Sequence, residues 1–90
     1  MTVYIASYDL RKPGRNYDAL YRRLADWKAL RVLESVWAIY TTSNAKTIRD
    51  DLKRYIDSGD GLLVAKLAGE AAWESLNGQS GPALKKMIEE

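Results

Sequence analysis

A single carboxylate at the end of a predicted strand is the residue of this chain best placed for chemistry. Residues 4–9 alternate apolar and small side chains, and the strand that they predict ends at Asp9, just before a Lys12-Pro13-Gly14 turn. A strand end is rigid and open at the rim of its sheet, so Asp9 could bind a metal ion or act as a general base. An aspartate that only begins a solvated loop would leave the same pattern.

The composition restricts which reactions Asp9 could take part in. The chain has no histidine and no cysteine, which removes the commonest general base, the commonest zinc ligand and thiolate chemistry. Hydrolysis would therefore rest on carboxylates, hydroxyls, Lys or Arg, with Mg²⁺ or Mn²⁺ as the expected cofactor. No run approaches the roughly 20 apolar residues of a membrane span, and no signal-peptide pattern opens the chain. We expect a cytoplasmic protein with no membrane partner.

The basic residues are distributed unevenly, although the net charge is only +2. Residues 1–42 carry seven Lys and Arg against four acids, whereas residues 43–90 carry seven against eight. The basic residues of the first half are Arg11, Lys12, Arg15, Arg22, Arg23, Lys28 and Arg31. Such a cluster near Asp9 could neutralise phosphates, or it could simply form a solvated helix face.

Two amphipathic helices are predicted between the strands. The first covers residues 17–29, with Asn16 as its N-cap and Leu20 and Leu24 on its inner face. The second begins after Ser43 or Asn44 and continues to about residue 56. Its inward positions are Ala45, Ile48, Leu52, Tyr55 and Ile56.

The remaining strands are recognised by β-branched and aromatic residues. Residues 31–42 predict either two strands that meet at a bend near residues 35–37 or one long bulged strand. Residues 62–67 predict a buried strand after a turn at 57–61. The tail has helix-like spacing at 70–76, a break at Asn77-Gly78 and a last helix that begins at Pro82.

The order of these elements predicts an α+β fold. Residues 1–67 read β-α-β-β-α-β, the ferredoxin-like sandwich with both helices on one sheet face, and residues 68–90 form a C-terminal helical tail. In residues 32–40 both alternating sets of side chains are apolar, so the second sheet face also needs a cover. The candidates are the tail, a second copy of the chain, or nucleobases stacked on aromatic side chains. We expect the tail to pack on the core or on a dimer partner.

Three segments resemble the CRISPR-associated protein 2 family. Residues 4–9 with Leu10-Arg11 resemble its Tyr-Asp-(Ile/Leu) strand, and residues 31–37 resemble its Ser-Val-aromatic segment. Ile56-Asp57 before residues 60–64 resembles its acidic turn into the last core strand. The similarity covers residues 2–67 in order and spacing. Virulence-associated protein D, a toxin-like ribonuclease, shares the superfamily fold.

The resemblance implies a ferredoxin-like homodimer. In the family, the aspartate that matches Asp9 comes from both protomers and flanks a shared divalent-metal site. Some members are metal-dependent ribonucleases or deoxyribonucleases, and others are non-catalytic bridges that hold the CRISPR integrase and its DNA. The loop at residues 12–15 departs from the family's basic first helix, and the tail does not read as its short fifth strand. The Ser-Tyr-Asp-Leu-Arg-Lys-Pro-Gly form is more similar to stand-alone relatives than to those that accompany CRISPR arrays.

The expected function is a Mg²⁺- or Mn²⁺-dependent endonuclease that acts on RNA or DNA through a shared pair of Asp9 carboxylates. Ser7 or Ser35 would support this ligand. The residues expected to hold phosphate oxygens are Arg11, Lys12 and Arg15.

Other functions remain open at the level of sequence. One is a non-catalytic dimeric scaffold, including a CRISPR spacer-acquisition bridge, with an integrase or an antitoxin as partner. Another is a nucleic-acid-binding sheet that stacks bases on Tyr4, Tyr8 and Trp37, as RNA-recognition motifs do.

Overall fold

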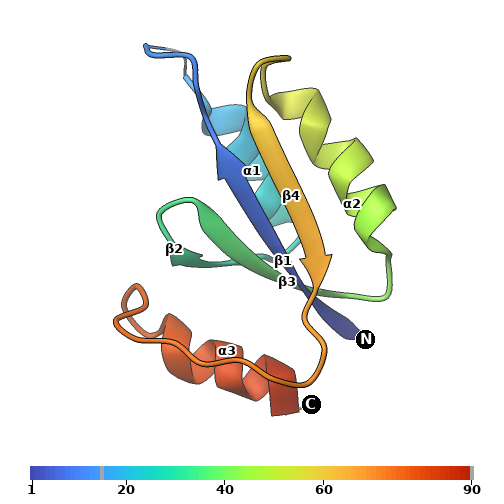
Figure 1. Ribbon diagram of the computed structural model, residues 1–90, viewed down its shortest axis with the longest axis vertical. Helices are drawn as coiled ribbons and strands as arrows, with labels where there is room; N and C mark the ends of the chain where they lie inside the picture. The colour runs from blue at the N-terminus through green and yellow to red at the C-terminus, as the bar shows by residue number, and fades with distance from the viewer. Residues whose placement is uncertain (15, 90) are drawn as a thin grey trace.

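The computed structural model describes residues 1–14 and 16–89, and it forms an α+β fold with a four-stranded antiparallel sheet and three α-helices (Figure 1). The elements follow in the order β1 (Thr2–Asp9), α1 (Asp18–Asp26), β2 (Leu30–Leu33), β3 (Val36–Thr41), α2 (Ala45–Leu52), the 3-10 helix η1 (Lys53–Tyr55), β4 (Gly61–Lys66) and α3 (Ser80–Glu89). No helix within the described residues is long and apolar enough to cross a lipid bilayer.

The sheet places the strand that carries Asp9 at its centre. The strand order is β2-β3-β1-β4, so β1 is hydrogen-bonded on both sides, whereas β2 and β4 are edge strands. In this register Asp9 lies opposite Gly61 of β4, and Ser7 lies opposite both Val36 and Leu63. Two flanking strands thus fix the backbone that ends at Asp9.

Helices α1 and α2 cover one face of the sheet (Figure 1). Leu20 and Leu24 of α1 and Ile48 and Leu52 of α2 are at most 1% exposed, which confirms the predicted inner faces of both helices. They pack against side chains that the strands direct to this face, among them Tyr4, Ala6, Tyr8, Trp37 and Ile39.

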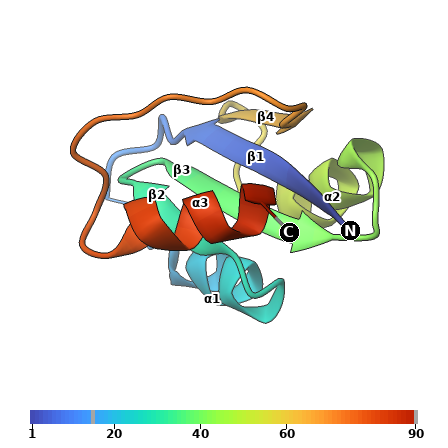
Figure 2. The same ribbon diagram turned by 90° about the horizontal axis from the view of Figure 1, so that it is seen from below.

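Helix α3 lies on the opposite face (Figure 1). Its Leu84 is buried against Val3, Val32 and Ala38. Figure 2 shows segment 67–79 leaving β4, crossing the molecule and turning back into α3. The tail of the chain therefore covers part of the second sheet face, which is one of the covers that the sequence left open. Leu63 of the edge strand β4 remains 64% exposed.

The structure corrects two local predictions and decides between two alternatives for a third segment. Residues 70–76 are not helical, because residues 71–75 are all exposed and Gly69 and Ser75 adopt positive φ angles of 87° and 56°. The N-cap of α1 is Tyr17, without a side-chain cap, and Asn16 instead accepts a hydrogen bond from the Asp18 N–H (2.7 Å). Of the two alternatives for segment 31–42, the structure confirms two strands, which are joined by a turn at Glu34–Ser35 with a register shift in β2 between Arg31 and Leu33.

A partly buried carboxylate joins the two helices of the first face. Asp51 of α2 accepts hydrogen bonds from Arg23 Nε (2.6 Å) and Nη2 (3.0 Å) of α1 and from Trp27 Nε1 (2.8 Å). Its side chain is only 13% exposed. The hydrogen bonds from Arg23 lower the pKa of Asp51, so the charged form is the one that the fold stabilises.

Replacing Asp51 should lower stability in a pH-dependent way. We expect Asp51→Asn to cost about 1–3 kcal/mol of unfolding free energy at pH 7, because it weakens hydrogen bonds to a charged group. Since the folded-state pKa is lowered, the difference from wild type should be full at neutral pH and should shrink as the pH falls below about 4. Urea denaturation of wild type and variant at a series of pH values measures the loss of unfolding free energy and its dependence on pH.

The neighbouring aspartate is a matched control for this experiment. Asp50 pairs with Lys46 and Arg49 on the solvent side of α2, and all three side chains are at least 40% exposed. Asp50→Asn should therefore cost under about 1 kcal/mol. Equal losses in the two variants would contradict the role of Asp51 as the link between the helices.

Candidate functional site at the end of the central strand

Asp9 is the last residue of β1, and its side chain is 70% exposed. Alternation along the strand directs Ser7 and Asp9 to the face that carries α3, while Tyr8 points into the core beneath α1 and α2. Figure 1 shows that α3 lies near the start of β1, far from the end that carries Asp9. The carboxylate thus stands on a fixed strand at the open end of the sheet.

The guanidinium of Arg11 lies directly beside this carboxylate. Arg11 Nε donates a hydrogen bond to Asp9 Oδ2 (2.9 Å), and its Nη1 donates to the carbonyl of Gly59 (3.2 Å). A β-carbon at Gly61 would lie only 3.0 Å from Arg11 Nη2, so a glycine at this position leaves room for the guanidinium. Arg11 is therefore held against the start of β4, next to Asp9, although its side chain is 59% exposed.

Asp60 fixes the loop from which Arg11 projects. Its Oδ1 accepts a hydrogen bond from the backbone N–H of Arg11 (2.7 Å), and its Oδ2 accepts from the Tyr17 hydroxyl (2.7 Å) and the Asp57 N–H (2.9 Å). Burial and the hydrogen bond to Asp60 raise the pKa of Tyr17. Asp60 thus joins the β1–α1 loop, the start of α1 and the turn before β4.

The donor set of one chain does not by itself fit a metal ion. Within residues 1–14 and 16–89, no group of three or more potential ligands is close enough to hold a metal. In one chain the charge of Asp9 is balanced by Arg11. The carboxylate of Asp60 already accepts hydrogen bonds from the Arg11 N–H and the Tyr17 hydroxyl. Two Asp9 carboxylates from two chains would match the few protein ligands that Mg²⁺ takes when it keeps most of its waters.

The other predicted site residues are distributed around Asp9. Ser7 shares its sheet face, two residues earlier in β1, whereas Ser35 lies in the β2–β3 turn, where its carbonyl accepts a hydrogen bond from the Tyr8 N–H (3.1 Å). Lys12 Nζ lies 3.9 Å from Asp57 Oδ2. Arg15 is outside the described residues. Of the two phosphate-binding candidates within the described residues, Arg11 lies against Asp9 and Lys12 lies near Asp57.

The predicted base-stacking platform is wrong. Tyr4, Tyr8 and Trp37 are each at least 92% buried, because their strand positions direct them beneath α1 and α2. The sequence could not show which of the two apolar sets of residues 32–40 the helices would cover.

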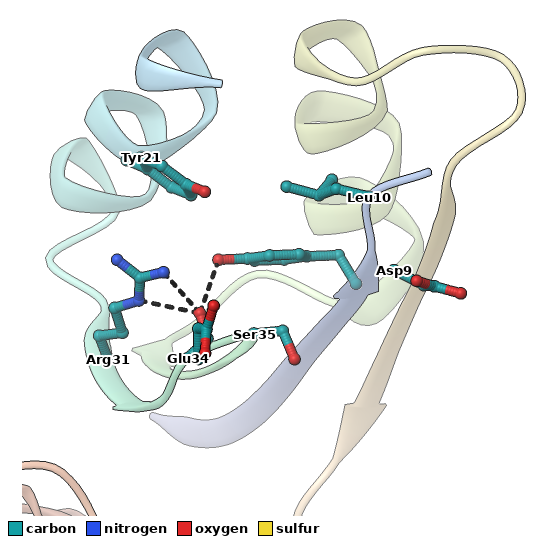
Figure 3. A pocket seen from close by; sticks show the side chains of 7 residues that line it. Asp9, Leu10, Tyr21, Arg31, Glu34 and Ser35 are labelled. Carbon is teal, nitrogen blue, oxygen red and sulfur yellow. Dashed lines mark hydrogen bonds between the residues drawn. The ribbon is translucent and has the colours of Figure 1, made fainter. Parts of the chain in front are cut away.

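A cleft that the sequence did not predict lies on the other side of the Asp9 backbone (Figure 3). The Glu34 carbonyl accepts hydrogen bonds from Arg31 Nε (3.0 Å), Arg31 Nη2 (2.6 Å) and the Tyr8 hydroxyl (3.2 Å). The Arg31 guanidinium lies 4.8 Å from the ring centre of Tyr21 and 5.3 Å from that of Trp37. Arg31 thus fastens the β2–β3 turn to α1, a role that its place among the predicted basic residues did not indicate.

The cleft has a volume of about 260 Å³ and is lined by Tyr8, Asp9, Leu10, Tyr21, Arg31, Glu34 and Ser35. Figure 3 shows that the Asp9 carboxylate points away from the cleft, toward β4. Burial raises the pKa of the Tyr8 hydroxyl, which also accepts a hydrogen bond from Trp37 Nε1 (3.0 Å). These polar groups of the cleft wall already have hydrogen-bond partners. The wall therefore serves as a packed support for the end of β1.

Comparison with known proteins supports the fold and leaves the function open. The structure is similar to the crystal structure of the hypothetical protein TT1823 from Thermus thermophilus, with a TM-score of 0.58 and 24% sequence identity. The match covers 82% of this chain and 90% of that one. No family model and no curated protein matches the sequence.

Removing the carboxylate of Asp60 should loosen the loop that carries Arg11. We expect Asp60→Ala to cost about 1–3 kcal/mol of unfolding free energy, because three hydrogen-bond donors lose a charged acceptor. Asp9→Ala, which removes an exposed ion pair, should cost under about 1 kcal/mol. Hydrogen exchange of the Arg11 amide should accelerate in the Asp60 variant alone, and equal protection in both variants would contradict this role.

Proposed function

We propose that this protein is a homodimer that acts on RNA or DNA as a Mg²⁺- or Mn²⁺-dependent endonuclease, as its resemblance to the CRISPR-associated protein 2 family implies. The observation that carries the proposal is the exposed Asp9 carboxylate at the fixed end of the central strand, with the Arg11 guanidinium beside it. A carboxylate and a guanidinium, the two groups that the proposal needs, are thus adjacent on a rigid support.

The same proposal assigns the core to the ferredoxin-like arrangement. Three features support this assignment: the strand order β2-β3-β1-β4, the antiparallel pairing of every neighbouring pair, and the packing of α1 and α2 on one face. The C-terminal helix α3 is an addition on the other face.

The proposed dimer uses the part of the second sheet face that α3 leaves open. Leu63 of β4 is 64% exposed and lies opposite Ser7, on the face to which Asp9 also points. A second chain that docks here would bury Leu63 and bring its own Asp9 toward the first one. The apolar side chain and the carboxylate would then belong to one interface.

Each residue of the proposed site has a distinct role. The Asp9 carboxylates of the two chains would hold the divalent ion, and Arg11 and Lys12 would hold the phosphate oxygens of the nucleic acid. Asp60 keeps the Arg11 backbone in place. When bound, a divalent ion would polarise the phosphodiester and lower the pKa of a bound water, which supplies the nucleophile in a chain without histidine.

A non-catalytic dimeric scaffold is the second candidate. The observation that favours it is the Asp9–Arg11 ion pair, because the two charges already balance within one chain and do not require a metal. In this case the dimer would bind nucleic acid or bridge a protein partner, such as a CRISPR integrase or an antitoxin.

Asp9→Asn tests the catalytic proposal. The change keeps the shape of the side chain but removes charge from both halves of the site, so Mg²⁺- or Mn²⁺-dependent cleavage of RNA and DNA oligonucleotides should fall at least about tenfold. Asp26→Asn is a matched control, because the Asp26 side chain is 68% exposed and also lies near an arginine. It should cleave at the wild-type rate.

The outcomes separate the two functions. Equal, chelator-insensitive cleavage by wild type and Asp9→Asn would indicate a contaminating nuclease and reject the catalytic proposal. A wild-type protein that binds oligonucleotide as a dimer without cleaving it, and does so equally after Asp9→Asn, would instead support the scaffold.

A further inference from the structure

The C-terminal cover, residues 68–89, consists of α3 and of an exposed strap that connects it to β4. Residues 68–75 and 77–79 of the strap are exposed, and three of its residues adopt positive φ angles: Gly69, Ser75 and Gly78. The strap crosses the molecule without forming a helix or a strand (Figure 2). It therefore buries little surface of its own, and the attachment of the cover to the sheet depends mainly on α3.

Helix α3 is anchored to the sheet by a narrow apolar stripe. Leu84 is buried, whereas Met87 and Ile88 beside it are only partly buried. Helices α1 and α2 each bury two large apolar side chains, and the hydrogen bonds of Asp51 join them to each other. Local opening costs least where few apolar side chains are buried. We therefore expect α3 to separate from the sheet more readily than α1 or α2.

The strap and α3 are also held to each other. The indole of Trp73 lies close to Gly81 of α3, because a β-carbon at Gly81 would lie 3.2 Å from Trp73 Nε1. The carbonyl of Asn77 accepts hydrogen bonds from the N–H (2.9 Å) and the hydroxyl of Ser80, the first residue of α3. Toward the sheet, the Asn77 N–H donates to the Val32 carbonyl of β2 (3.0 Å). The contacts within the cover can thus persist when those with the sheet are broken.

The surface beneath the cover is apolar. Strands β1, β2 and β3 contribute side chains that are buried or partly buried on this face, among them Val3, Val32, Ala38 and Tyr40. Leu63 of β4 lies on the same face and is already exposed. Removal of the cover would therefore expose a continuous apolar surface of a kind that monomeric proteins rarely present to solvent.

We propose that the C-terminal cover is a lid that opens as a unit and exposes this apolar surface while the sheet, α1 and α2 remain folded. In the closed state Leu84 packs on the surface and keeps it from solvent. The lid thereby controls when the surface is accessible. This device is independent of the function proposed above, because α3 lies far from the end of β1 that carries Asp9 (Figure 1).

Native-state hydrogen exchange of the full wild-type chain tests the lid. It is measured by nuclear magnetic resonance at a series of urea concentrations below the unfolding transition. The amides of Asn77 and of residues 84–89 should exchange through one shared opening, with the same weak dependence on urea and at least about tenfold faster than the amides of β1. Amides of α3 that exchange as slowly as those of β1 would overturn the lid. Separate openings for Asn77 and α3 would overturn its movement as a unit.

Two matched variants test the anchor. Leu84→Ser removes the buried side chain, and Lys85→Ser introduces the same residue at the exposed neighbouring position of the same helix. Leu84→Ser should accelerate exchange at Asn77 and in α3 by at least about tenfold and leave the amides of β1 and α1 unchanged. It should also increase the fluorescence of anilinonaphthalene sulfonate, a dye that binds exposed apolar surface. Lys85→Ser should behave like wild type in both measurements.

The other outcomes contradict the proposal. Loss of protection throughout the chain in Leu84→Ser would show that α3 unfolds only together with the core. Unchanged exchange and dye binding in Leu84→Ser would show that Leu84 does not anchor the lid. Equal effects of Leu84→Ser and Lys85→Ser would show that the helix itself, and not its contact with the sheet, had been weakened.

Discussion

The hydrogen bonding of β1 to both β3 and β4 is the constraint on which the rest of the structure depends. It fixes the end of the strand and places Asp9 opposite Gly61, where no side chain competes with Arg11 for space. It also sets the alternation that directs Tyr8 into the core and Asp9 toward the open face. The cleft around Arg31 and the hydrogen bonds of Asp60 support the same strand end from either side.

The parts of the fold with a strong periodic pattern could be predicted from sequence. The inner faces of both helices were predictable because apolar residues four positions apart lie on one face of a helix. These residues are Leu20, Leu24, Ile48 and Leu52. Segment 70–76 was wrongly predicted because its spacing is helical, whereas residues 71–75 are exposed and form no helix. The position of α3 depended on long-range packing of Leu84 against Val3, Val32 and Ala38, which no local pattern encodes.

The candidate site could be predicted only in part, because part of it depends on contacts between residues that are far apart in the sequence. Asp9 was identifiable because it ends a recognisable strand. Its pairing with Arg11 was not, because that pairing depends on the Asp60 carboxylate 49 residues away and on the space above Gly61. The ion pair changes what the sequence alone suggested about Asp9, because its charge is balanced by Arg11 within the same chain.

The central claim is that two chains meet on the open part of the sheet face and bring their Asp9 residues together. Sedimentation equilibrium at tens of micromolar protein tests it most directly. The account predicts a mass twice the 10.2 kDa of one chain, and a return to the monomer mass in Leu63→Glu, whose exposed position should leave the monomer folded. A wild-type monomer of 10.2 kDa under these conditions would contradict the account, because one chain alone offers a single Asp9 that is already paired with Arg11.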